Sequence, residues 1–217
     1  MVNSKLYSFL MSFFIGLGFI ILTTLNLNSN GVNAETLSSD YIESETIDEM
    51  VLGSDDAPVV LIEYASFTCP HCRTFHEDSC LKLKKNYIDS GQVKFIFREV
   101  YFDKYGLWAA MVARCSGSER YFGLVDLIFK KQDEWTTGNV DEVVGKLERI
   151  GKISGMSENQ IQTCLQNNTK ARALVERYRE NALEDSIKST PSFIINGKLY
   201  SNMNYNELIE IIENNLN

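Results

Sequence analysis

Three of the five cysteines and both histidines of the chain lie within fifteen residues, SFTCPHCRTFHEDSC, at positions 66–80. Proline is favoured at the first position of a helix, where its missing N–H would have had no partner, so Pro70 predicts a helix with Cys69 as its N-cap. The free N–H groups and the dipole at that end stabilise a thiolate and so lower the pKa of Cys69. His71 can add positive charge or a hydrogen bond. Cys72 follows one turn later, within reach of a disulfide with Cys69, so the spacing predicts a redox-active pair.

A metal site and a purely structural disulfide are the competing interpretations of this stretch. A zinc site would combine Cys69 and Cys72 with His76 and Cys80. On one straight helix, however, Cys69 and Cys80 lie about 16 Å apart along the axis. Zinc ligands all lie within roughly 2.0–2.3 Å of one point. We therefore expect no metal here, and we favour the redox pair over a structural bridge.

The two remaining side chains of the stretch receive plainer interpretations. His76 lies near Cys72 on the helical wheel, and we interpret it as a packed histidine at the edge of the core rather than as a proton shuttle. Cys80 falls on the flank of the buried face and is interpreted as a half-buried, inert thiol. A regulatory or intermolecular role is the alternative for Cys80.

Residues 1–34 have the features of an export signal peptide. Lys5 precedes the uncharged run 6–25, and the small-residue pattern Val-Asn-Ala, suited to signal peptidase, ends at Ala34. We expect cleavage after Ala34. A retained anchor is the alternative, because about 20 apolar residues can also span a bilayer. Either way, the remainder is expected in an exported, oxidising compartment, the periplasm.

The chain that remains without this signal is acidic. Removing Lys5 changes the net charge from -8 to -9, which argues against a nucleic-acid partner because phosphate binding needs clustered Lys and Arg. Residues 35–217 suffice for one domain with a hydrophobic core, so the cysteines need specific explanations rather than a role in stapling a very small fold. Residues 35–57 are polar and acidic, and we expect a linker or a weakly ordered N-terminal segment there.

The hydrophobic pattern after residue 57 predicts an α/β fold interrupted by helices. An apolar β-branched run, a helical pattern and a second apolar run follow one another, which predicts a β-α-β unit with parallel strands. Asn196-Gly197 between two later runs is a strong signal for a hairpin with a type I′ turn. We expect strands at 59–67, 93–102, 192–195 and 198–200, a helix at 70–90, helices through most of 105–186 and a last amphipathic helix near the C-terminus.

Two segments, LIEYASFTCPHCRTFHE and STPSFIING, resemble the DsbA family of exported thiol-disulfide oxidoreductases. That family has a thioredoxin fold interrupted by a helical domain, and the resemblance covers nearly all of residues 58–217. It implies a thioredoxin-like fold formed by 58–104 and 187–217, with an inserted α-helical domain at 105–186. The CPHC motif alone would be weak evidence, whereas the motif together with the later TPSF segment is specific.

The resemblance also implies roles for the residues of the motif. Cys69 would be the exposed nucleophile and Cys72 the resolving thiol. The dipeptide Pro70-His71 between them is the one typical of strongly oxidising members. A family acid at the position of Glu63 helps proton transfer to the buried thiol. The alternative for Glu63 is a strand-edge glutamate that reaches solvent.

A second part of the implied site is the TPSF segment. The resemblance implies a cis peptide between Thr190 and Pro191, in a loop beside the active site with which the extended backbone of a substrate pairs. A proline that simply opens a strand is the plainer alternative. Thr190 differs from the valine common in the best-known oxidases and also occurs in isomerases, which leaves the direction of catalysis open.

Cys115 and Cys164 lie on the apolar faces of two separate predicted helices of the insertion. In an oxidising compartment a structural disulfide between them is the natural pairing, and some DsbA-like proteins carry a second bridge in this domain. Two buried free cysteines are the alternative. The bridge would be part of the scaffold rather than of the catalytic site.

These observations predict a thiol-disulfide oxidoreductase that donates its Cys69–Cys72 disulfide to reduced exported proteins. A membrane partner of the DsbB type would reoxidise it, and no metal or organic cofactor is needed. A monomer is expected. A disulfide isomerase or a narrow-substrate oxidase of the same fold is the alternative within redox chemistry. A non-catalytic peptide-binding or chaperone module is the alternative from another class.

Overall fold

The computed structural model describes residues 45–216. The signal peptide expected at 1–34, together with the alternative of a retained anchor, lies outside the described residues. None of the helices within residues 45–216 combines the length and the apolar character that a bilayer crossing requires.

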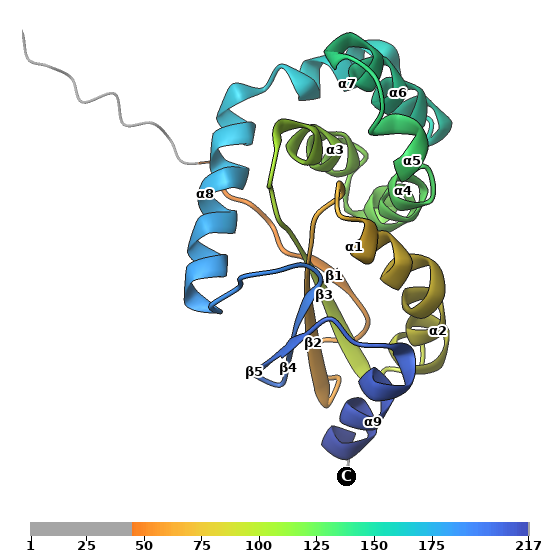
Figure 1. Ribbon diagram of the computed structural model, residues 1–217, viewed down its shortest axis with the longest axis vertical. Coiled ribbons are helices and arrows are strands. Elements are labelled where there is room, and N and C mark those ends of the chain that lie inside the picture. The colour runs from red at the N-terminus through yellow and green to blue at the C-terminus, as the bar shows by residue number, and fades with distance from the viewer. Residues whose placement is uncertain (1–44, 217) are drawn as a thin grey trace, which may run out of the picture. The chain divides into compact units, whose positions relative to one another are not determined.

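A five-stranded mixed sheet forms the centre of this region, in the order β1-β3-β2-β4-β5 (Figure 1). The strands β2 and β3 are parallel, as the β-α-β pattern predicted, whereas the other three pairs are antiparallel. The strands are β1 Met50–Leu52, β2 Val59–Ala65, β3 Val93–Glu99, β4 Ser192–Ile195 and β5 Lys198–Ser201.

The strand β2 forms the centre of the sheet because neighbouring strands pair with both of its edges and neighbouring side chains bury much of its surface. Leu61 pairs with Phe95 on one side and with Ile195 on the other. All three side chains are buried in the main hydrophobic core. Continuous β-branched and apolar runs of this kind are what a strand buried on both faces requires.

The expectation of a linker across 35–57 is wrong for Met50–Leu52. These residues form β1, which pairs antiparallel with β3 in the register Met50 with Phe97, and Met50 is buried. A three-residue strand is too short to show an alternating pattern. Its formation depends on the hydrogen bonds offered by the edge of β3, which the local sequence does not reveal.

One continuous helical segment follows β2, but it is not the regular α-helix that we expected at 70–90. It consists of α1 Pro70–Phe75, the π-helical turn η1 His76–Cys80, α2 Leu81–Leu83 and the second π-helical turn η2 Lys84–Ile88. A π-helical turn places about one extra residue in the turn and changes which side chains face the core. Such turns often occur at functional sites. Cys80, expected on the flank of the helix, is accordingly buried.

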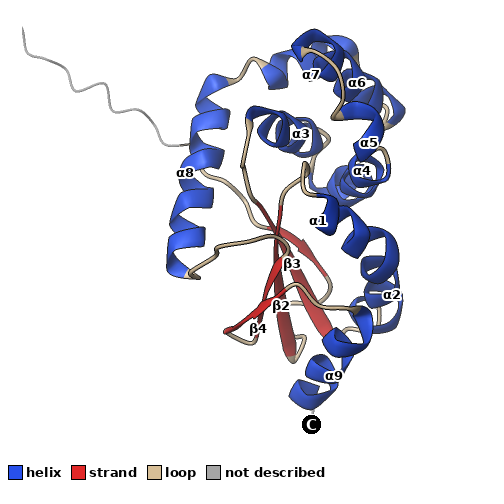
Figure 2. Cartoon of the chain, viewed as in Figure 1, coloured by secondary structure: helices blue, strands red, loops and turns tan. Residues whose placement is uncertain are grey.

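The predicted helical insertion is present between β3 and β4. Figure 2 shows that no strand interrupts it. Its first helix begins at an N-cap aspartate, Asp103, whose side chain accepts hydrogen bonds from the N–H groups of Tyr105 and Gly106. The helices are α3 Lys104–Cys115, α4 Ser118–Lys130, α5 Gln132–Trp135, α6 Val140–Ile153, α7 Glu158–Leu165 and α8 Asn168–Glu184.

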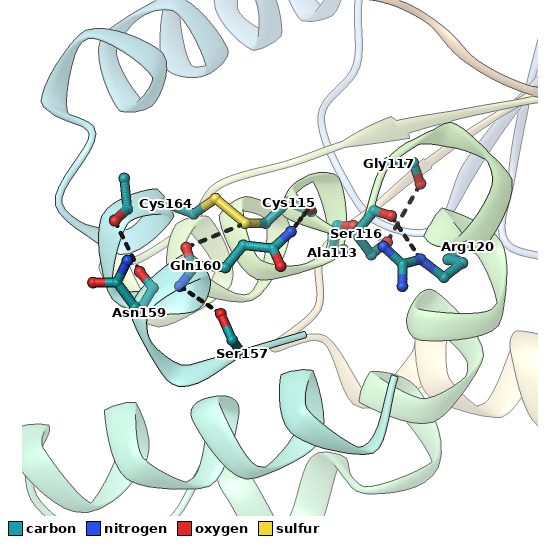
Figure 3. Close-up of a disulfide and its surroundings, with 10 residues drawn as sticks. Ala113, Cys115, Ser116, Gly117, Arg120, Ser157, Asn159, Gln160 and Cys164 are labelled. Carbon is teal, nitrogen blue, oxygen red and sulfur yellow. Dashed lines mark hydrogen bonds between the residues drawn. A yellow bond between two sulfur atoms is a disulfide. The ribbon is translucent and has the colours of Figure 1, made fainter. Parts of the chain in front are cut away.

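A disulfide joins Cys115, the last residue of α3, to Cys164 of α7 (Figure 3). Their Cα atoms are 6.1 Å apart. The side chain of Gln160 on α7 also donates a hydrogen bond to the carbonyl of Cys115, at 3.3 Å. The expected pairing is therefore confirmed, and the alternative of two free cysteines is wrong.

Helices cover both faces of the sheet (Figure 1). On one face lie α1, α2 and the C-terminal helix α9 Tyr205–Leu216, which buries Leu208 and Ile212. On the other face lies α8, where the hydroxyl of Tyr64 on β2 donates to the carboxylate of Asp185 at the end of α8, at 2.5 Å.

The hairpin between β4 and β5 has the predicted turn. Asn196 and Gly197 both have positive φ, 46° and 81°. A type I′ turn requires positive φ at both central positions. The hairpin matters for the site because β4 begins directly after Pro191 and pairs with β2, which leads to the CPHC motif.

Candidate active site

The CPHC motif begins the helix as the position of Pro70 predicted. Cys69 is the N-cap of α1, with extended backbone angles of φ -87° and ψ 119°, and Pro70 is the first helical residue. The N–H of Arg73 donates to the carbonyl of Cys69 at 3.2 Å. Cys69 is partly exposed at this end of the helix.

The surroundings of Cys69 favour its thiolate. A hydrogen bond from the thiol of Cys72 is the largest influence. Partial burial opposes it, whereas the side chain of Thr190 and the backbone N–H groups of Cys72 and His71 act with it. Together they lower the pKa of Cys69 from 9.0 to about 5. At neutral pH the sulfur is therefore charged, which makes it both a nucleophile and a good leaving group.

Cys72 has the opposite properties. Its side chain is fully buried in the core. Burial, the hydrogen bond to Cys69 and the negative charge of Glu63 raise the pKa of the Cys72 thiol far above its usual value. Cys69, Cys72 and Cys80 are all free, so the structure describes the dithiol form of the pair. One thiol is accessible and ionised, and the other is hidden and neutral.

The TPSF segment lies against the nucleophile. The Thr190–Pro191 peptide bond is cis, as the family resemblance implied. The sulfur of Cys69 lies 3.5 Å from the carbonyl oxygen of Thr190, to which the thiol form donates a hydrogen bond. Pro191 is buried and Thr190 is partly exposed beside the sulfur. Whether a substrate backbone pairs with this loop remains a prediction.

Glu63 is fully buried in β2, and the alternative of a solvent-exposed glutamate at a strand edge is wrong. Its Oε2 lies 3.1 Å from Nε2 of His76 on η1. His76 is also buried, and its ring stacks on Phe129 with centroids 4.3 Å apart. The interpretation of His76 as a packed side chain did not foresee this ion pair, because the two residues belong to different elements.

Two side chains of α5 in the insertion contact the segment around the motif, and neither had a signal in the sequence. The side-chain amide of Gln132, which is 2% exposed, donates to the carbonyls of Phe67 and Cys69 at 2.8 and 3.0 Å. The carboxylate of Asp133 forms an ion pair with Arg73, the residue after the motif. These two side chains of α5 therefore hold the backbone that precedes the helix and the first turn of the helix itself.

A thioredoxin fold with a helical insertion, and a CPHC motif at a helix N-terminus facing a cis-proline, define the class of DsbA-like thiol-disulfide oxidoreductases. The chain belongs to the thioredoxin family, whose model, described as "Thioredoxin", matches residues 45–214. The comparisons with individual proteins agree with this class.

Among related proteins, the disulfide bond formation protein D of Bacillus subtilis is 31% identical over 175 residues, which cover 76% of each chain. A protein of Rickettsia bellii, provisionally named a protein-disulfide oxidoreductase, is 32% identical over 166 residues. Those residues are 76% of this chain but 63% of the rickettsial protein, so the chain matches less than two thirds of that relative's length.

Among solved structures, α-DsbA1 of Wolbachia pipientis superposes with a TM-score of 0.72 at 26% identity, over 81% of this chain and 94% of that one. Oxidised BdbD of Bacillus subtilis superposes with a TM-score of 0.70 at 29% identity, over 77% of this chain and 92% of that one.

Proposed function

We propose that the protein is an exported dithiol oxidase that donates its Cys69–Cys72 disulfide to reduced exported proteins. The observation that carries this proposal is the opposite ionisation of two thiols three positions apart. Cys69 is partly exposed with a pKa of about 5, and Cys72 is buried and neutral. Such a pair can react with a large substrate at one sulfur and regenerate the disulfide with the other.

The proposed cycle begins with the Cys69–Cys72 disulfide. A substrate thiolate attacks the sulfur of Cys69, the disulfide breaks, and Cys72 leaves and takes up a proton. The substrate is then joined to Cys69 by a mixed disulfide. A second thiolate of the substrate attacks the substrate sulfur of that bond, and Cys69 leaves as a thiolate. The substrate gains a disulfide, and the enzyme keeps the two electrons as a dithiol.

The direction of this cycle follows from the stability of the Cys69 thiolate. Groups that stabilise the thiolate stabilise the reduced protein, and a stable reduced form makes the disulfide a stronger oxidant. The hydrogen bonds that lower the pKa of Cys69 therefore favour disulfide donation. No metal or organic cofactor takes part, because the electrons move between sulfur atoms.

The loop at Thr190 and Pro191 is the proposed binding site for the substrate backbone. It lies within hydrogen-bond distance of Cys69, and Thr190 is partly exposed there. An extended segment placed along this loop would bring its cysteine to the accessible sulfur. Thiol pairs in newly exported, unfolded proteins are the proposed substrates.

The surroundings of the reaction are also part of the proposal. The protein acts as a monomer in the periplasm, and a quinone-linked membrane protein of the DsbB type reoxidises Cys69 and Cys72. The low pKa of Cys69 supports such a partner, because a strongly oxidising pair needs a strong oxidant to restore its disulfide.

The reduction potential of the Cys69–Cys72 pair in glutathione buffers tests the direction. We expect a potential of about -120 mV, as for DsbA. A potential of about -270 mV, as for thioredoxin, would indicate a reductase. The Cys72→Ala variant should retain substrates as mixed disulfides on Cys69. A Cys69→Ser variant that still supports substrate folding normally would establish a non-catalytic binding protein instead.

A further inference from the structure

Glu63 lies in β2, and the residues paired with it on both neighbouring strands are apolar. Opposite it are Phe97 on β3 and Phe193 on β4, and all three side chains are fully buried. An isolated carboxylate loses its hydration in such surroundings, so burial favours its neutral form unless a cation lies against it. The ionisation of Glu63 therefore depends on what contacts its two oxygens.

His76 is the group that contacts the first of these oxygens. Its Nε2 lies 3.1 Å from Oε2 of Glu63, and its Nδ1 lies 3.7 Å from Oδ1 of Asp126 on α4. The second distance is too long for a hydrogen bond, but it is short enough for an ion pair. The Glu63 side chain is 0% exposed and that of Asp126 is 49% exposed. The ring is thus fixed between a buried and a half-exposed carboxylate.

The charges around the ring favour the imidazolium form. Burial alone would lower the pKa of His76, but Glu63, Cys80 and Asp126 raise it well above its usual value. These three groups come from three different elements, β2, η1 and α4. The remaining ring contacts are the aromatic side chains Phe75, Phe97 and Phe129.

The second oxygen of Glu63 is available for the resolving thiol. Oε1 is buried and has no hydrogen-bond partner among the described residues. The charge of Glu63 also contributes to the raised pKa of Cys72, so the two groups interact. A buried carboxylate oxygen without a donor, whose charge acts on a thiol that must lose its proton, is suited to accept that proton.

We propose that His76 is a positioning residue that keeps Glu63 ionised, so that Glu63 can take the proton of Cys72 whenever the Cys69–Cys72 disulfide closes. This inference rests on the function proposed above and adds a residue to its resolving step. In the sheet beside Glu63 the neighbouring position on β3 is Phe97. The positive charge is therefore supplied from the helical segment rather than from the strand.

The step can be written with glutathione as the leaving thiol. Cys69 starts in a mixed disulfide with glutathione, and Cys72 transfers its proton to Glu63. The electron pair of the Cys72 sulfur forms the bond to Cys69. The bond between Cys69 and glutathione breaks, and glutathione leaves as a thiolate with that electron pair. Glu63 then returns the proton to solvent.

The His76→Gln variant of the full chain tests this proposal. The reduced protein is mixed with oxidised glutathione, quenched with acid after increasing times and weighed by mass spectrometry, which separates adduct formation from closure. At pH 7 we expect closure to be about tenfold slower than in the wild type or slower still, since complete loss of a general base typically costs about 10²–10⁴-fold. Adduct formation should be unchanged, because the Cys69 thiolate attacks without help from Glu63.

The pH profile distinguishes this role from simple packing. In His76→Gln, closure should be slow at pH 7, should accelerate as pH rises and should then level off near the wild-type rate. Glu63→Gln should be slow without such a plateau, and the double variant should behave as Glu63→Gln does. Closure in His76→Gln at the wild-type rate at pH 7, or slowed by one constant factor at every pH, would overturn the proposal.

Two controls keep the test decisive. Lys85→Gln removes a positive charge from the same helical segment at an exposed position and should close at the wild-type rate. If His76→Gln does not fold, NMR titration of the wild type replaces it. The chain has two histidines, so a His71→Gln sample assigns the imidazole signals. The imidazole signals should show that His76 stays protonated well above pH 6.5. Loss of its proton at or below that pH would overturn the proposal.

Glutathione also separates this inference from the proposed function. Adduct formation and closure are measurable whether or not the protein oxidises other proteins. A reductase-like potential together with the slow, pH-dependent closure expected for His76→Gln would reject the oxidase and retain the role of His76. An oxidase-like potential together with closure at the wild-type rate in His76→Gln would retain the oxidase and reject the role of His76.

Discussion

At the scale of single residues, the site depends on the contrast between two identical side chains. Cys69 has the free N–H groups of a helix end and Thr190 beside it, whereas Cys72 has the core around it and Glu63 nearby. Three positions of sequence separate the two environments. The position of the helix start, fixed by Pro70, decides which sulfur receives which environment.

The first prediction concerns the pH dependence of the reduction potential. Above pH 5 the reduced protein holds Cys69 as a thiolate and Cys72 as a thiol, so reduction takes up one proton. The potential should then fall by about 30 mV per pH unit, and by about twice that below pH 5, where both sulfurs are protonated. Equilibration with glutathione across this range measures both slopes. A slope of about 60 mV per pH unit that continues up to pH 8 would show that the pKa of Cys69 is not lowered.

The second prediction concerns Thr190. Thr190→Val keeps the shape of the side chain but removes the hydroxyl that favours the Cys69 thiolate. One hydrogen bond contributes about 1 kcal/mol, so the thiol–thiolate equilibrium should move roughly fivefold toward the thiol. The absorbance of the thiolate near 240 nm, followed through an acid titration, measures the change. Thr190→Ser retains the hydroxyl and should titrate like the wild type.

At the scale of elements, the short helix α5 connects the insertion to the motif. Gln132 binds two carbonyls of the segment that leads into α1, and Asp133 pairs with Arg73 inside it. The insertion is therefore part of the support of the active site as well as a neighbour of it. The disulfide between α3 and α7 stabilises the same helical region by about 4 kcal/mol in the chain-entropy description.

The third prediction concerns Gln132. Gln132→Ala leaves the buried carbonyls of Phe67 and Cys69 without their side-chain donor. The free energy of unfolding should fall by about 2 kcal/mol, and amide exchange should become faster around the motif. Urea unfolding and hydrogen exchange measure these changes. Gln162→Ala, at an exposed position of α7, should change neither quantity, and equal losses in both variants would argue against this role of Gln132.

The sequence predicted the elements whose signals are local and missed the contacts that are not. The N-cap position of Cys69, the parallel pair β2 and β3, and the turn at Asn196 follow from neighbouring residue types. The pair Glu63 and His76 joins a strand to a π-helical turn, and nothing in the local sequence indicates that the two side chains meet.

The remaining omissions have the same physical origin. Gln132 looks like any polar residue in a short helix, and only the fold brings its amide to the carbonyl of Cys69. The strand β1 exists because β3 offers it an edge. Family resemblance, rather than pattern, supplied the cis bond before Pro191.

At the scale of the whole molecule, the charge on one sulfur links redox state to folding. The pKa of Cys69 is about 5 in the folded dithiol form, against 9.0 for an unperturbed thiol. A lowered pKa stabilises the folded state fully above the unfolded value, and this stabilisation is lost as pH falls through the folded value. The oxidised protein has no thiol at this position and lacks the effect.

The fourth prediction follows from that difference. Between about pH 5 and pH 9, the free energy of unfolding of the reduced protein, minus that of the oxidised protein, should increase with pH. Below pH 5 the difference should be constant. Urea unfolding of both forms at several pH values measures it. A difference that does not change with pH would show that the Cys69 thiolate is no more stable in the fold than in the unfolded chain.

The position of β4 in the sequence has a consequence for the synthesis and folding of the chain. Val60 on β2 and Asn196 at the hairpin turn bond to each other although 136 positions separate them. A chain made from its N-terminus thus exposes one edge of β2 until Ser192–Ile195 have been made, and open edges of this kind can pair with other chains. The nucleophile is synthesised well before the loop that faces it, because 121 positions separate Cys69 from Thr190. A ribosome-bound chain therefore carries a reactive sulfur before it carries a complete site, and any early protection of that sulfur must come from outside the fold.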